Sequence, residues 1–344
     1  MNLYEKINQR VYTIAEMSGN HAGSKERALE IIHAAHEAGA DCIKIQTYTP
    51  DTITLNCNNR YFHIDGGTWE GETLYHLYGQ AYTPWEWQAD LKAEADKLGL
   101  DFLSTPFDTT AVDFLQSIGL EFYKIASFEL TQIPLIRYVA SRNKPMIIST
   151  GMGTSDEIEA AVRAVTEAGN SQLVLLKCSS DYPAVTDEMN LRTMVDMNRA
   201  FGVPVGLSDH SMGNIGVVAA VAMGARVIEK HFCISRKVEN PDSSFSLEPQ
   251  EFKQMVEDIR TAELAMGRVK YGPSEREKEN LQFRQSIFCS ADIKAGEAFT
   301  KENVRIVRPG VGLPPACIDE VLGKRAACDI VFGTPLSFDM IKNE

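Results

Sequence analysis

FYKIASFELTQIPLIRYVASRNKPMIISTGM, residues 122–152, contains two short apolar runs that flank a segment with helical spacing. The runs at residues 122–127 and 146–150 are nearly continuous in apolar character, which is typical of parallel strands buried on both faces. The order strand, helix, strand predicts one repeating unit of a parallel sheet.

Six further apolar runs of this kind lie on either side of that stretch. They occupy residues 11–17, 42–47, 101–107, 173–178, 205–209 and 227–232. A helical pattern follows each run, and residues 251–266 supply the eighth helix. Eight successive units of strand and helix predict an α/β fold of the (β/α)8 TIM barrel type rather than a doubly wound sheet.

The segment between the second and third predicted strands is unusually long. Residues 48–82 exceed the usual length of a loop between strand and helix, and they are rich in aromatic side chains. We expect either a self-packed surface excursion or a substrate lid. The next helix has its own start signal, since Thr83-Pro84-Trp85-Glu86 offers an N-cap, a proline at the first helical position and a capping-box glutamate.

Chain length and shifts in composition predict two domains. The chain has 344 residues, whereas a barrel of this type takes about 250. We expect a catalytic barrel over residues 1–267, a charged and turn-rich linker over 268–283, and a compact β-rich domain over 284–344. The core of so small a domain is marginal alone, so we expect it to dock on another surface.

Charge and apolar content exclude several classes of partner. The formal net charge of −13 repels polyanions, so neither nucleic acid nor an anionic membrane is expected. No apolar run approaches the roughly 20 residues of a membrane span, and MNLYEKINQR at the N-terminus lacks the apolar core of a signal peptide. Seven scattered cysteines without a CxxC pair indicate reduced thiols and hence a cytoplasmic protein.

Polar side chains gather where the predicted strands end, which is the catalytic face of a barrel. Buried lysines and carboxylates are costly unless they are paired, so several of them at one barrel mouth indicate a ligand. A compact ligand with a phosphate and a carboxylate could be held through charge-assisted hydrogen bonds by Lys44, Thr105, Lys124, Ser127, Ser149 and Ser208. The alternative is that the lysines pair internally with Glu16, Glu129 and Glu229.

Two histidines close neighbouring strands. His210 and His231 end the seventh and eighth predicted strands, and two imidazoles side by side form half of a divalent-metal site, with positions left for substrate and water. A lone histidine there would more often be a structural hydrogen-bonding group. Cys178 is a nucleophile candidate by position only, because the sequence shows no histidine partner for it, and barrel lining explains it better.

Nine motifs resemble the sialic acid synthase family. They are AEMSGNHAGS (15–24), CIKIQT (42–47), STPFD (104–108), YKIASFE (123–129), ISTGM (148–152), GLSDHS (206–211), EKHF (229–232), NPDSSFS (240–246) and VRPG (307–310). They follow the family order over nearly the whole chain, and residues 284–344 resemble the family's C-terminal antifreeze-like (SAF) domain. The resemblance implies an enzyme that condenses phosphoenolpyruvate with an amino-sugar.

Three stretches resemble the pseudaminic acid synthase branch of that family: IQTYTPDTIT (45–54), LYHLYGQAYTPWEW (74–87) and STPFDTTAVDFL (104–115). This branch implies that phosphoenolpyruvate, 2,4-diacetamido-2,4,6-trideoxy-L-altrose and water give pseudaminic acid and phosphate by C–O cleavage. N-acetylneuraminate and legionaminate synthases share the chemistry and most of the motifs, so they remain alternatives. Ser180 departs from sialic acid synthases, which tend to have asparagine there, and this fits an altered contact with the amino-sugar.

The resemblance also implies a role for each candidate residue. Phosphoenolpyruvate would be bound by Lys44, Thr105, Lys124, Ser127, Ser149 and Ser208, and a divalent cation (Mn²⁺, Mg²⁺ or Co²⁺) by His210 and His231. The amino-sugar would contact Glu16, Tyr182, Asp242 and Arg308. Catalysis would involve Glu16, Lys124 and Glu129, with Glu129 close to C2 and the attacking water. Arg308 would come from the C-terminal domain of a partner chain, which implies a domain-swapped homodimer.

Three other functions fit parts of the pattern. A metal-independent Schiff-base aldolase would use Lys124 or Lys177 as its nucleophile. A ketodeoxy-sugar phosphate synthase would share the chemistry but require a phosphorylated aldose. A catalytically silent carbohydrate-binding protein would keep the barrel and the small domain, but it would not need the intact set of His210, His231, Lys124 and Glu129.

Overall fold

The structure, a computed structural model, describes residues 2–342. The chain divides into two units, Met1–Gly267 and Arg268–Glu344. Residues 1, 343 and 344, at the outer ends of the two predicted domains, lie outside the described residues. Within the described part of the chain, no helix combines the length and apolar character needed to cross a membrane.

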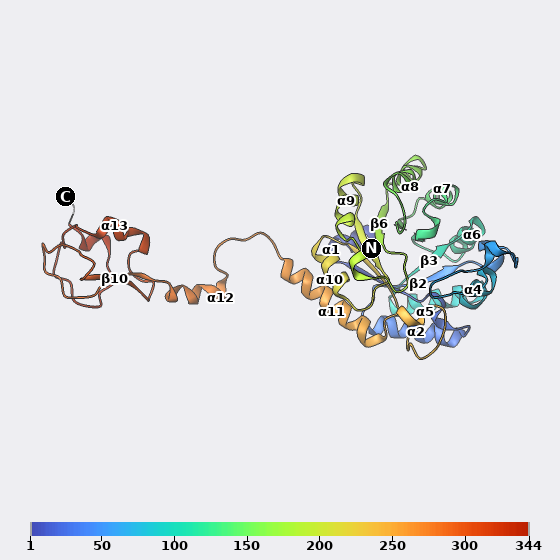
Figure 1. Ribbon diagram of the computed structural model, residues 1–344, viewed down its shortest axis with the longest axis horizontal. Helices are drawn as coiled ribbons and strands as arrows, with labels where there is room; N and C mark the ends of the chain where they lie inside the picture. The colour runs from blue at the N-terminus through green and yellow to red at the C-terminus, as the bar shows by residue number, and fades with distance from the viewer. Residues whose placement is uncertain (1, 343–344) are drawn as a thin grey trace. The chain divides into compact units, whose positions relative to one another are not determined.

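Eight parallel strands close into a barrel in the order of the sequence (Figure 1). They are β1 (Tyr12–Glu16), β2 (Cys42–Thr47), β3 (Asp101–Pro106), β4 (Tyr123–Ile125), β5 (Met146–Ser149), β6 (Leu173–Cys178), β7 (Val205–Asp209) and β8 (Val227–His231). The pairing of β8 with β1, which sets His231 opposite Glu16, closes the sheet. The predicted TIM barrel is confirmed. Strand β4 is shorter than residues 122–127 because Ser127–Glu129 form the 3-10 helix η3.

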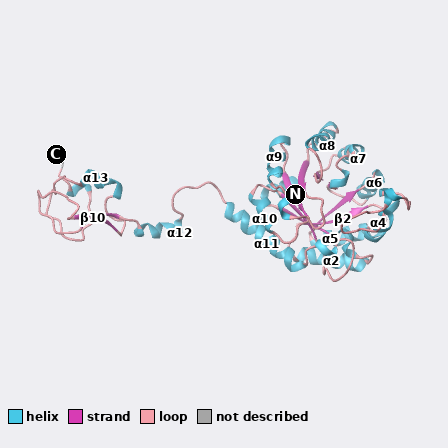
Figure 2. Ribbon diagram, in the orientation of Figure 1, coloured by secondary structure: helices cyan, strands magenta, loops and turns pink. Residues whose placement is uncertain are grey.

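Helices follow the strands and surround the barrel (Figure 2). They are α2 (Lys25–Glu37), α5 (Trp85–Leu98), α6 (Thr109–Ser117), α7 (Ile133–Ala140), α8 (Ser155–Glu167), α9 (Arg192–Phe201), α10 (Ile215–Ala222) and α11 (Pro249–Met266). The expected N-cap of α5 is wrong, since Pro84 rather than Thr83 holds that position. The hydroxyl of Thr83 instead lies 3.3 Å from Nε2 of His21, so a tertiary contact has replaced the cap.

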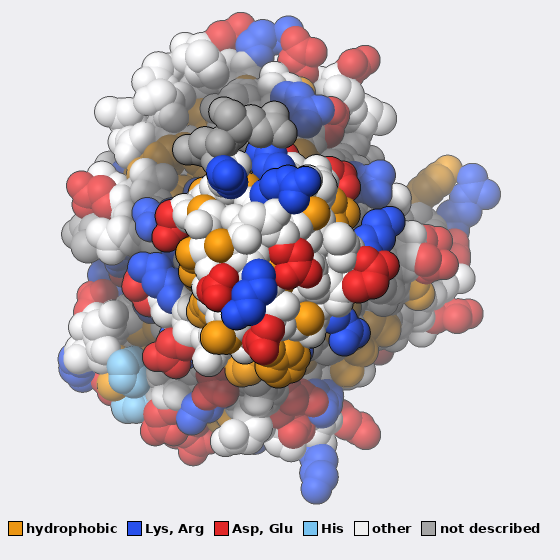
Figure 3. All heavy atoms as spheres, turned by 90° about the vertical axis from the view of Figure 1, so that its left-hand side faces the viewer, with side chains coloured by type: hydrophobic (Ala, Val, Ile, Leu, Met, Phe, Trp, Pro, Cys, Tyr) orange, Lys and Arg blue, Asp and Glu red, His pale blue; other side chains and the backbone are white. Residues whose placement is uncertain are grey.

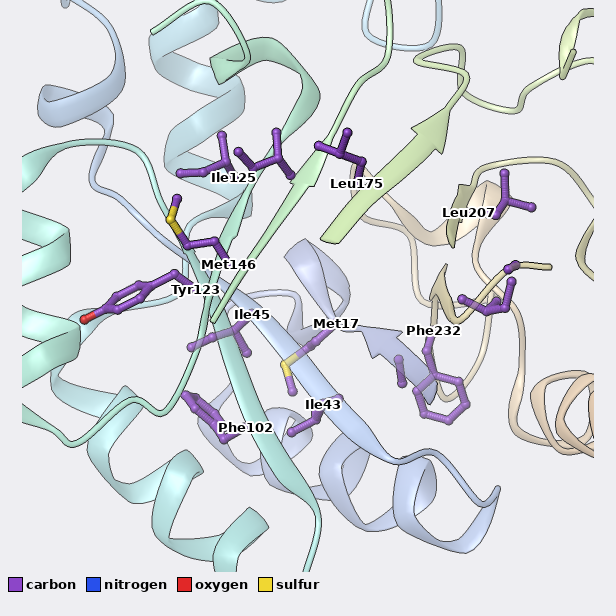
Figure 4. Close-up of a cluster of buried hydrophobic side chains, with 14 of the residues drawn as sticks. Met17, Ile43, Ile45, Phe102, Tyr123, Ile125, Met146, Leu175, Leu207 and Phe232 are labelled. Atoms are coloured by element: carbon purple, nitrogen blue, oxygen red, sulfur yellow. The ribbon is translucent and has the colours of Figure 1, made fainter. Parts of the chain in front are cut away.

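The strand side chains alternate between two apolar layers. Outward-facing residues pack beneath the helices, as Ile43, Phe102, Ile125 and Leu207 do in Figure 4. A second buried cluster, to which α1 (Leu3–Gln9) contributes, fills the N-terminal end of the barrel. It comprises Leu3, Ile7, Tyr12, Ile14, Cys42, Leu103, Phe122, Ile147, Val174, Leu176 and Val227. This cluster closes the N-terminal end, where Tyr12 and Lys6 contact the carboxylate of Asp101.

The long connection (residues 48–82) is partly helical rather than a plain loop. It contains α3 (Pro50–Ile53), the 3-10 helix η2 (Arg60–Phe62) and α4 (Leu74–Ala81). Tyr48 at its start is buried, and its ring centroid lies 5.6 Å from that of Tyr78 and 5.1 Å from that of Phe107. Part of the aromatic content therefore serves packing.

The second unit contains two short antiparallel strands, β9 (Ser286–Cys289) and β10 (Val304–Val307), and the short helices α12 (Glu275–Lys278) and α13 (Ile318–Val321). The predicted small β-rich domain after the barrel is confirmed. Its own core comprises Ile287, Cys289, Ile293, Phe299, Val304, Leu313, Val321, Ala326, Ile330, Leu336 and Ile341. Figure 3 shows the side of the molecule that lies at the left in Figure 1, and on this face acidic and basic side chains are interspersed with hydrophobic ones.

Further 3-10 turns join these elements. They are η1 (Ser18–His21), η4 (Thr186–Glu188), η5 (Ser243–Phe245), η6 (Glu279–Phe283), η7 (Pro315–Cys317) and η8 (Phe338–Met340).

Candidate active site

A layer of buried polar side chains lies above the apolar filling of the barrel. Side chains on a strand alternate between its faces, so Glu16 lies on the same face of β1 as the inward-facing Ile14. The same alternation gives each of the remaining strands except β6 at least one inward polar group near its end, and β6 presents the thiol of Cys178 there. The members of this layer are Glu16, Lys44, Thr105, Lys124, Ser149, Ser208, Glu229 and His231, all of them buried.

Lys44 is held between two carboxylates. Its Nζ lies 2.8 Å from Oε2 of Glu16 and 3.2 Å from Oε1 of Glu229, and it donates a 3.5 Å hydrogen bond to Oγ1 of Thr105. Burial alone would lower the pKa of Lys44, but Glu16 and Glu229 raise it above its usual value. Lys44 is therefore a fixed cation of the site.

Lys124 joins the same cluster from β4. Its Nζ donates to Oγ of Ser149 at 2.6 Å and to the carbonyl of Ile125 at 3.1 Å, and it lies 3.8 Å from Oε1 of Glu229. Burial lowers the pKa of this lysine below its usual value. The second cation is thus bound less tightly by counter-ions than Lys44 is.

Glu229 is the centre of this network and was not among the predicted site residues. Its Oε1 contacts both lysines and accepts a 3.2 Å hydrogen bond from Ser208, while its Oε2 has no hydrogen-bond partner among the described residues. The lysines pair internally in part, as the alternative interpretation held, and the partners are Glu16 and Glu229. Side chains alternate between the two faces of β8. This rule predicts from the sequence that Glu229 and His231 share the inner face.

Glu129 does not pair with either lysine. It ends η3, just beyond β4, and its Oε2 is buried without a hydrogen-bond partner within the described residues. Burial raises the pKa of Glu129 from 4.5 to about 7, although the charge of Lys124 acts in the opposite direction. A carboxyl group that changes charge near neutral pH is suited to assist a reaction there.

Ser127 lies in a narrow part of the mouth that requires glycine opposite it. Its Oγ accepts a 3.1 Å hydrogen bond from the backbone N–H of Gly151. A Cβ at Gly151 would lie 2.1 Å from Oγ of Ser180 and 2.8 Å from Oγ of Ser127. The hydroxyl groups of Ser127 and Ser180 therefore both lie against the backbone of Gly151. The sequence did not predict this contact of Ser180.

The two imidazoles lie side by side as predicted, with ring centroids 5.2 Å apart. Nδ1 of His210 lies 2.8 Å from the carbonyl oxygen of Ser179, so Nε2 is its other ring nitrogen available to a ligand. Nδ1 of His231 has no partner among the described residues. Burial and the neighbouring His210 lower the pKa of His231 well below its usual value, so its ring is neutral. A neutral imidazole such as that of His231 fits a divalent cation as a donor. Burial acts to lower the pKa of His210, but Cys178 raises it above its usual value.

The protein supplies only part of such a coordination sphere. No cluster of three or more His, Cys, Asp and Glu side chains is arranged to hold a metal within residues 2–342. Further ligands would have to be oxygen atoms of substrate and water, as in open catalytic metal sites.

Cys178 lies next to His210. Its Sγ lies 3.8 Å from Nδ1 of His210, across the pairing of β6 with β7. Burial opposes ionisation, but His210 lowers the pKa of Cys178 to about 7. The expectation that this thiol lacks a partner is therefore wrong. Lys177, the other lysine considered as a nucleophile, is half-buried and donates to the carbonyl of Cys178 at 2.7 Å.

Loop residues line the other side of the mouth. Oδ2 of Asp242 accepts a 2.8 Å hydrogen bond from the backbone of Gly19, which follows Ser18, a residue with the unusual φ of 47°. The ring centroid of Tyr182 lies 4.3 Å from that of His210 and 5.2 Å from that of Phe245. Backbone strain of this kind is concentrated at functional sites.

Two family models match the chain. The model of the NeuB family covers residues 31–271, and the model of the SAF domain covers residues 284–342. The chain belongs to the NeuB family. The predicted resemblance to the sialic acid synthases and their SAF domain is confirmed.

Relatives of this NeuB-family protein match nearly its whole length. Pseudaminic acid synthase of Campylobacter jejuni is 47% identical and covers 95% of this chain and 96% of that protein. N,N'-diacetyllegionaminic acid synthase of Legionella pneumophila is 37% identical over 96% of this chain and 94% of that protein. The crystal structure of N-acetylneuraminic acid synthetase from Leptospira borgpetersenii, in complex with citrate, has a TM-score of 0.71 at 31% identity and covers 80% of this chain and 92% of that one.

The predicted site residues of this NeuB-family protein divide between its two units. Those of the barrel unit lie at the C-terminal strand ends or in the loops that follow. Arg308 lies directly after β10 in the second unit. Its predicted place in the site of a partner chain stays a prediction.

Proposed function

We propose that this chain is a pseudaminic acid synthase. It condenses phosphoenolpyruvate with 2,4-diacetamido-2,4,6-trideoxy-L-altrose and water, giving pseudaminic acid and phosphate. The observation that carries this proposal is the buried layer at the barrel mouth, where two lysines and several hydroxyl groups lie close to a pair of imidazoles. The choice of branch is supported by the 47% identity to a pseudaminic acid synthase, against 37% to a legionaminic acid synthase.

Phosphoenolpyruvate, with its phosphate and carboxylate, suits the positive half of this layer. Lys44 and Lys124 supply two cations, and the hydroxyl groups that accompany them donate neutral hydrogen bonds. The hydroxyl groups are those of Thr105, Ser127, Ser149 and Ser208. Because Glu16 and Glu229 raise the pKa of Lys44, this lysine stays charged before the substrate arrives.

The divalent cation belongs to the opposite side of the layer. His210 and His231 are its proposed protein ligands, and Mn²⁺, Mg²⁺ and Co²⁺ all accept imidazole together with oxygen donors. When bound, the cation supplies a Lewis acid that polarises the aldehyde of the open-chain sugar. Glu16, Tyr182 and Asp242 surround this side and are the proposed contacts of the sugar.

Glu129 is the proposed acid–base group of the reaction. As C3 of phosphoenolpyruvate forms a bond to the aldehyde carbon, positive charge develops at C2. The carboxylate of Glu129 stabilises that charge and orients the water that adds to C2, taking up its proton. The tetrahedral intermediate then breaks the C2–O bond and releases inorganic phosphate.

A Schiff-base aldolase is the second candidate, because burial lowers the pKa of Lys124 and so favours its nucleophilic form. Lys124 is nevertheless held by Ser149 and lies within 3.8 Å of Glu229, contacts that keep an ammonium group. Borohydride reduction in the presence of the sugar and pyruvate separates the two candidates. The synthase leaves no covalent adduct on Lys124.

The site is proposed to be completed by a second copy of the chain. Phe128, Met152 and Met212 are exposed large apolar side chains on loops that follow β4, β5 and β7. An apolar rim of this kind suits an interface. Arg308 of the second copy would enter the site, in a domain-swapped homodimer with a catalytic barrel (residues 1–267), a linker (268–283) and a SAF domain (284–344).

The cytoplasm is the proposed compartment. All seven cysteines are free thiols in the structure. Free thiols persist in reducing compartments.

The acceptor sugar is tested by competition. Phosphoenolpyruvate is offered with equal amounts of the altrose derivative, N-acetylmannosamine and the precursor of legionaminic acid, and the products are separated by mass spectrometry. The proposal expects pseudaminic acid as the main product. Turnover of N-acetylmannosamine alone would refute the branch assignment.

A further inference from the structure

The dipeptide Thr68-Trp69 of the long connection is bound to two separate loops at the barrel mouth. The hydroxyl of Thr68 donates to the carbonyl of Tyr182, in the loop after β6. Nε1 of Trp69 donates to the carbonyl of Pro241 at 2.9 Å, in the loop after β8. This one point of the long connection therefore lies against both loops that carry proposed sugar contacts, since Asp242 follows Pro241 directly.

The ring of Tyr182 links Trp69 to His210, one of the two proposed metal ligands. Its ring centroid lies 5.4 Å from that of Tyr182, which in turn lies 4.3 Å from that of His210. An acceptor with its aldehyde at the imidazole pair would extend outward along Tyr182. The carbon farthest from the aldehyde then arrives at Trp69.

We propose that Trp69 is a specificity-determining residue whose ring contacts the C6 methyl group of the acceptor sugar. This inference rests on the proposed function, because it needs the aldehyde to lie at His210 and His231. An indole ring that is only partly buried offers apolar surface for a methyl group, and a hydroxymethyl group gains less from it. One apolar group in a binding site changes selectivity by roughly 10- to 200-fold.

The surroundings of Trp69 also disfavour a charged distal end. Trp69 lines an open pocket of about 360 Å³ together with Glu70, Glu72 and Glu239. Glu72 contacts Nδ1 of His76, and the carboxylates of Glu70 and Glu239 add further negative charge to this pocket. They would repel a phosphate group placed against Trp69. The acceptor class that fits is therefore an uncharged 6-deoxy aldose rather than a sugar phosphate.

The test compares two sugars that differ only at C6. One is the altrose derivative, and the other is 2,4-diacetamido-2,4-dideoxy-L-altrose, in which a hydroxymethyl group replaces the methyl group. The ratio of their kcat/KM values is measured for the wild type, Trp69→Ala and Trp69→Phe. We expect the preference for the 6-deoxy sugar to fall about 10-fold in Trp69→Ala and to stay near the wild-type value in Trp69→Phe, with the KM for phosphoenolpyruvate unchanged.

Two controls separate contact from tethering and from misfolding. Tyr61→Ala removes an exposed ring from the same connection and should leave the ratio unchanged. Trp69→Phe keeps an apolar ring but loses the hydrogen bond to Pro241. A ratio that falls equally in Trp69→Phe and Trp69→Ala would assign the effect to that hydrogen bond and overturn the inference.

Other outcomes also decide the matter. An equal loss of kcat/KM for both sugars in Trp69→Ala would show that Trp69 only holds the connection in place. This result would overturn the inference but not the proposed function. A wild type that accepts neither sugar but converts N-acetylmannosamine would contradict the proposed function and the inference together. These cases are told apart by the wild-type measurement.

Discussion

Oε1 of Glu229 lies 3.2 Å from the ammonium group of Lys44, with the Nζ of a second lysine, Lys124, 3.8 Å away. One carboxylate therefore stands between two buried cations, and all three side chains are nearly inaccessible to solvent. Such an arrangement holds positive charge in place for an anionic substrate while limiting the repulsion between the lysines.

The substitution Glu229→Gln should destabilise the barrel. Removing one partner of a buried ion pair leaves an uncompensated charge and costs about 3–5 kcal/mol. Urea unfolding should therefore show a lower unfolding free energy for the variant. Inorganic phosphate should restore more stability to Glu229→Gln than to the wild type, because an anion can replace the missing charge. Glu121→Gln, at an exposed position, is the matched control and should change stability by less than about 0.5 kcal/mol.

Activity should depend on the ionisation of Glu129. Its pKa is raised to about 7 by burial, and the proposed mechanism uses its carboxylate form. We expect kcat to rise with pH through a midpoint near 7, measured as phosphate release at saturating substrates. Glu129→Gln should lose about 10²- to 10⁴-fold in kcat and lose that midpoint as well. A variant with the wild-type pH profile would remove Glu129 from the mechanism.

The same carboxyl group should make stability depend on pH in a defined direction. Because the pKa in the folded state is about 7 and the usual value is 4.5, the folded protein binds the proton more tightly. This contribution is present in full below about pH 4.5 and is lost as the pH rises through 7. It amounts to about 2–3 kcal/mol.

Unfolding free energies of the wild type and Glu129→Gln, measured between pH 5 and 8, check this sign. The wild type should lose stability relative to the variant as the pH rises. Parallel curves for the two proteins would show that Glu129 is not desolvated as the structure indicates.

Metal binding should stabilise the protein through the two imidazoles. Adding Mn²⁺ to protein freed of metal with EDTA should raise the melting temperature of the wild type. His210→Ala and His231→Ala should each abolish most of that increase. Equal stabilisation of all three proteins would place the metal elsewhere. EDTA should also abolish synthesis, and Mn²⁺ should restore it.

Mixed dimers test the proposed origin of Arg308. Arg308→Ala and Glu129→Gln each damage a different part of the proposed site, and they are co-expressed with two different tags. In a swapped dimer, a barrel with intact Glu129 receives an intact Arg308 from its partner, so the purified hybrid should regain roughly one active site in two. A hybrid as inactive as either parent would show that Arg308 acts within its own chain, whereas full activity of Arg308→Ala alone would show that it does not act in the site.

The barrel followed from the sequence because buried parallel strands leave a clear apolar signal, and the strand ends then identified the mouth. Lys44, Lys124 and His231 lie in the buried layer at that mouth, and the ring of His210 lies beside that of His231. Glu229 was expected only as an internal partner of the lysines, although alternation along β8 places it on the inner face beside His231. The contact of Cys178 with His210 was missed although a sequential barrel makes β6 and β7 neighbours.

The contacts of the loops could not be predicted in the same way. Thr83 carries a good N-cap signal, yet it lies against His21, because a tertiary hydrogen bond competes with a local one. The proximity of Ser180 to Gly151 and of Trp69 to Tyr182 depends on loop conformations that have no sequence period. The aromatic content of residues 48–82 indicated a special role for the long connection. It did not indicate which aromatic ring lies near the site.

The fate of the bridging oxygen of phosphoenolpyruvate tests the central claim most directly. Phosphoenolpyruvate labelled with ¹⁸O between C2 and phosphorus is incubated with the altrose derivative and the metal-loaded protein, and both products are weighed by mass spectrometry. The account predicts labelled inorganic phosphate together with unlabelled pseudaminic acid. Unlabelled phosphate, or the absence of a nine-carbon product, would contradict it.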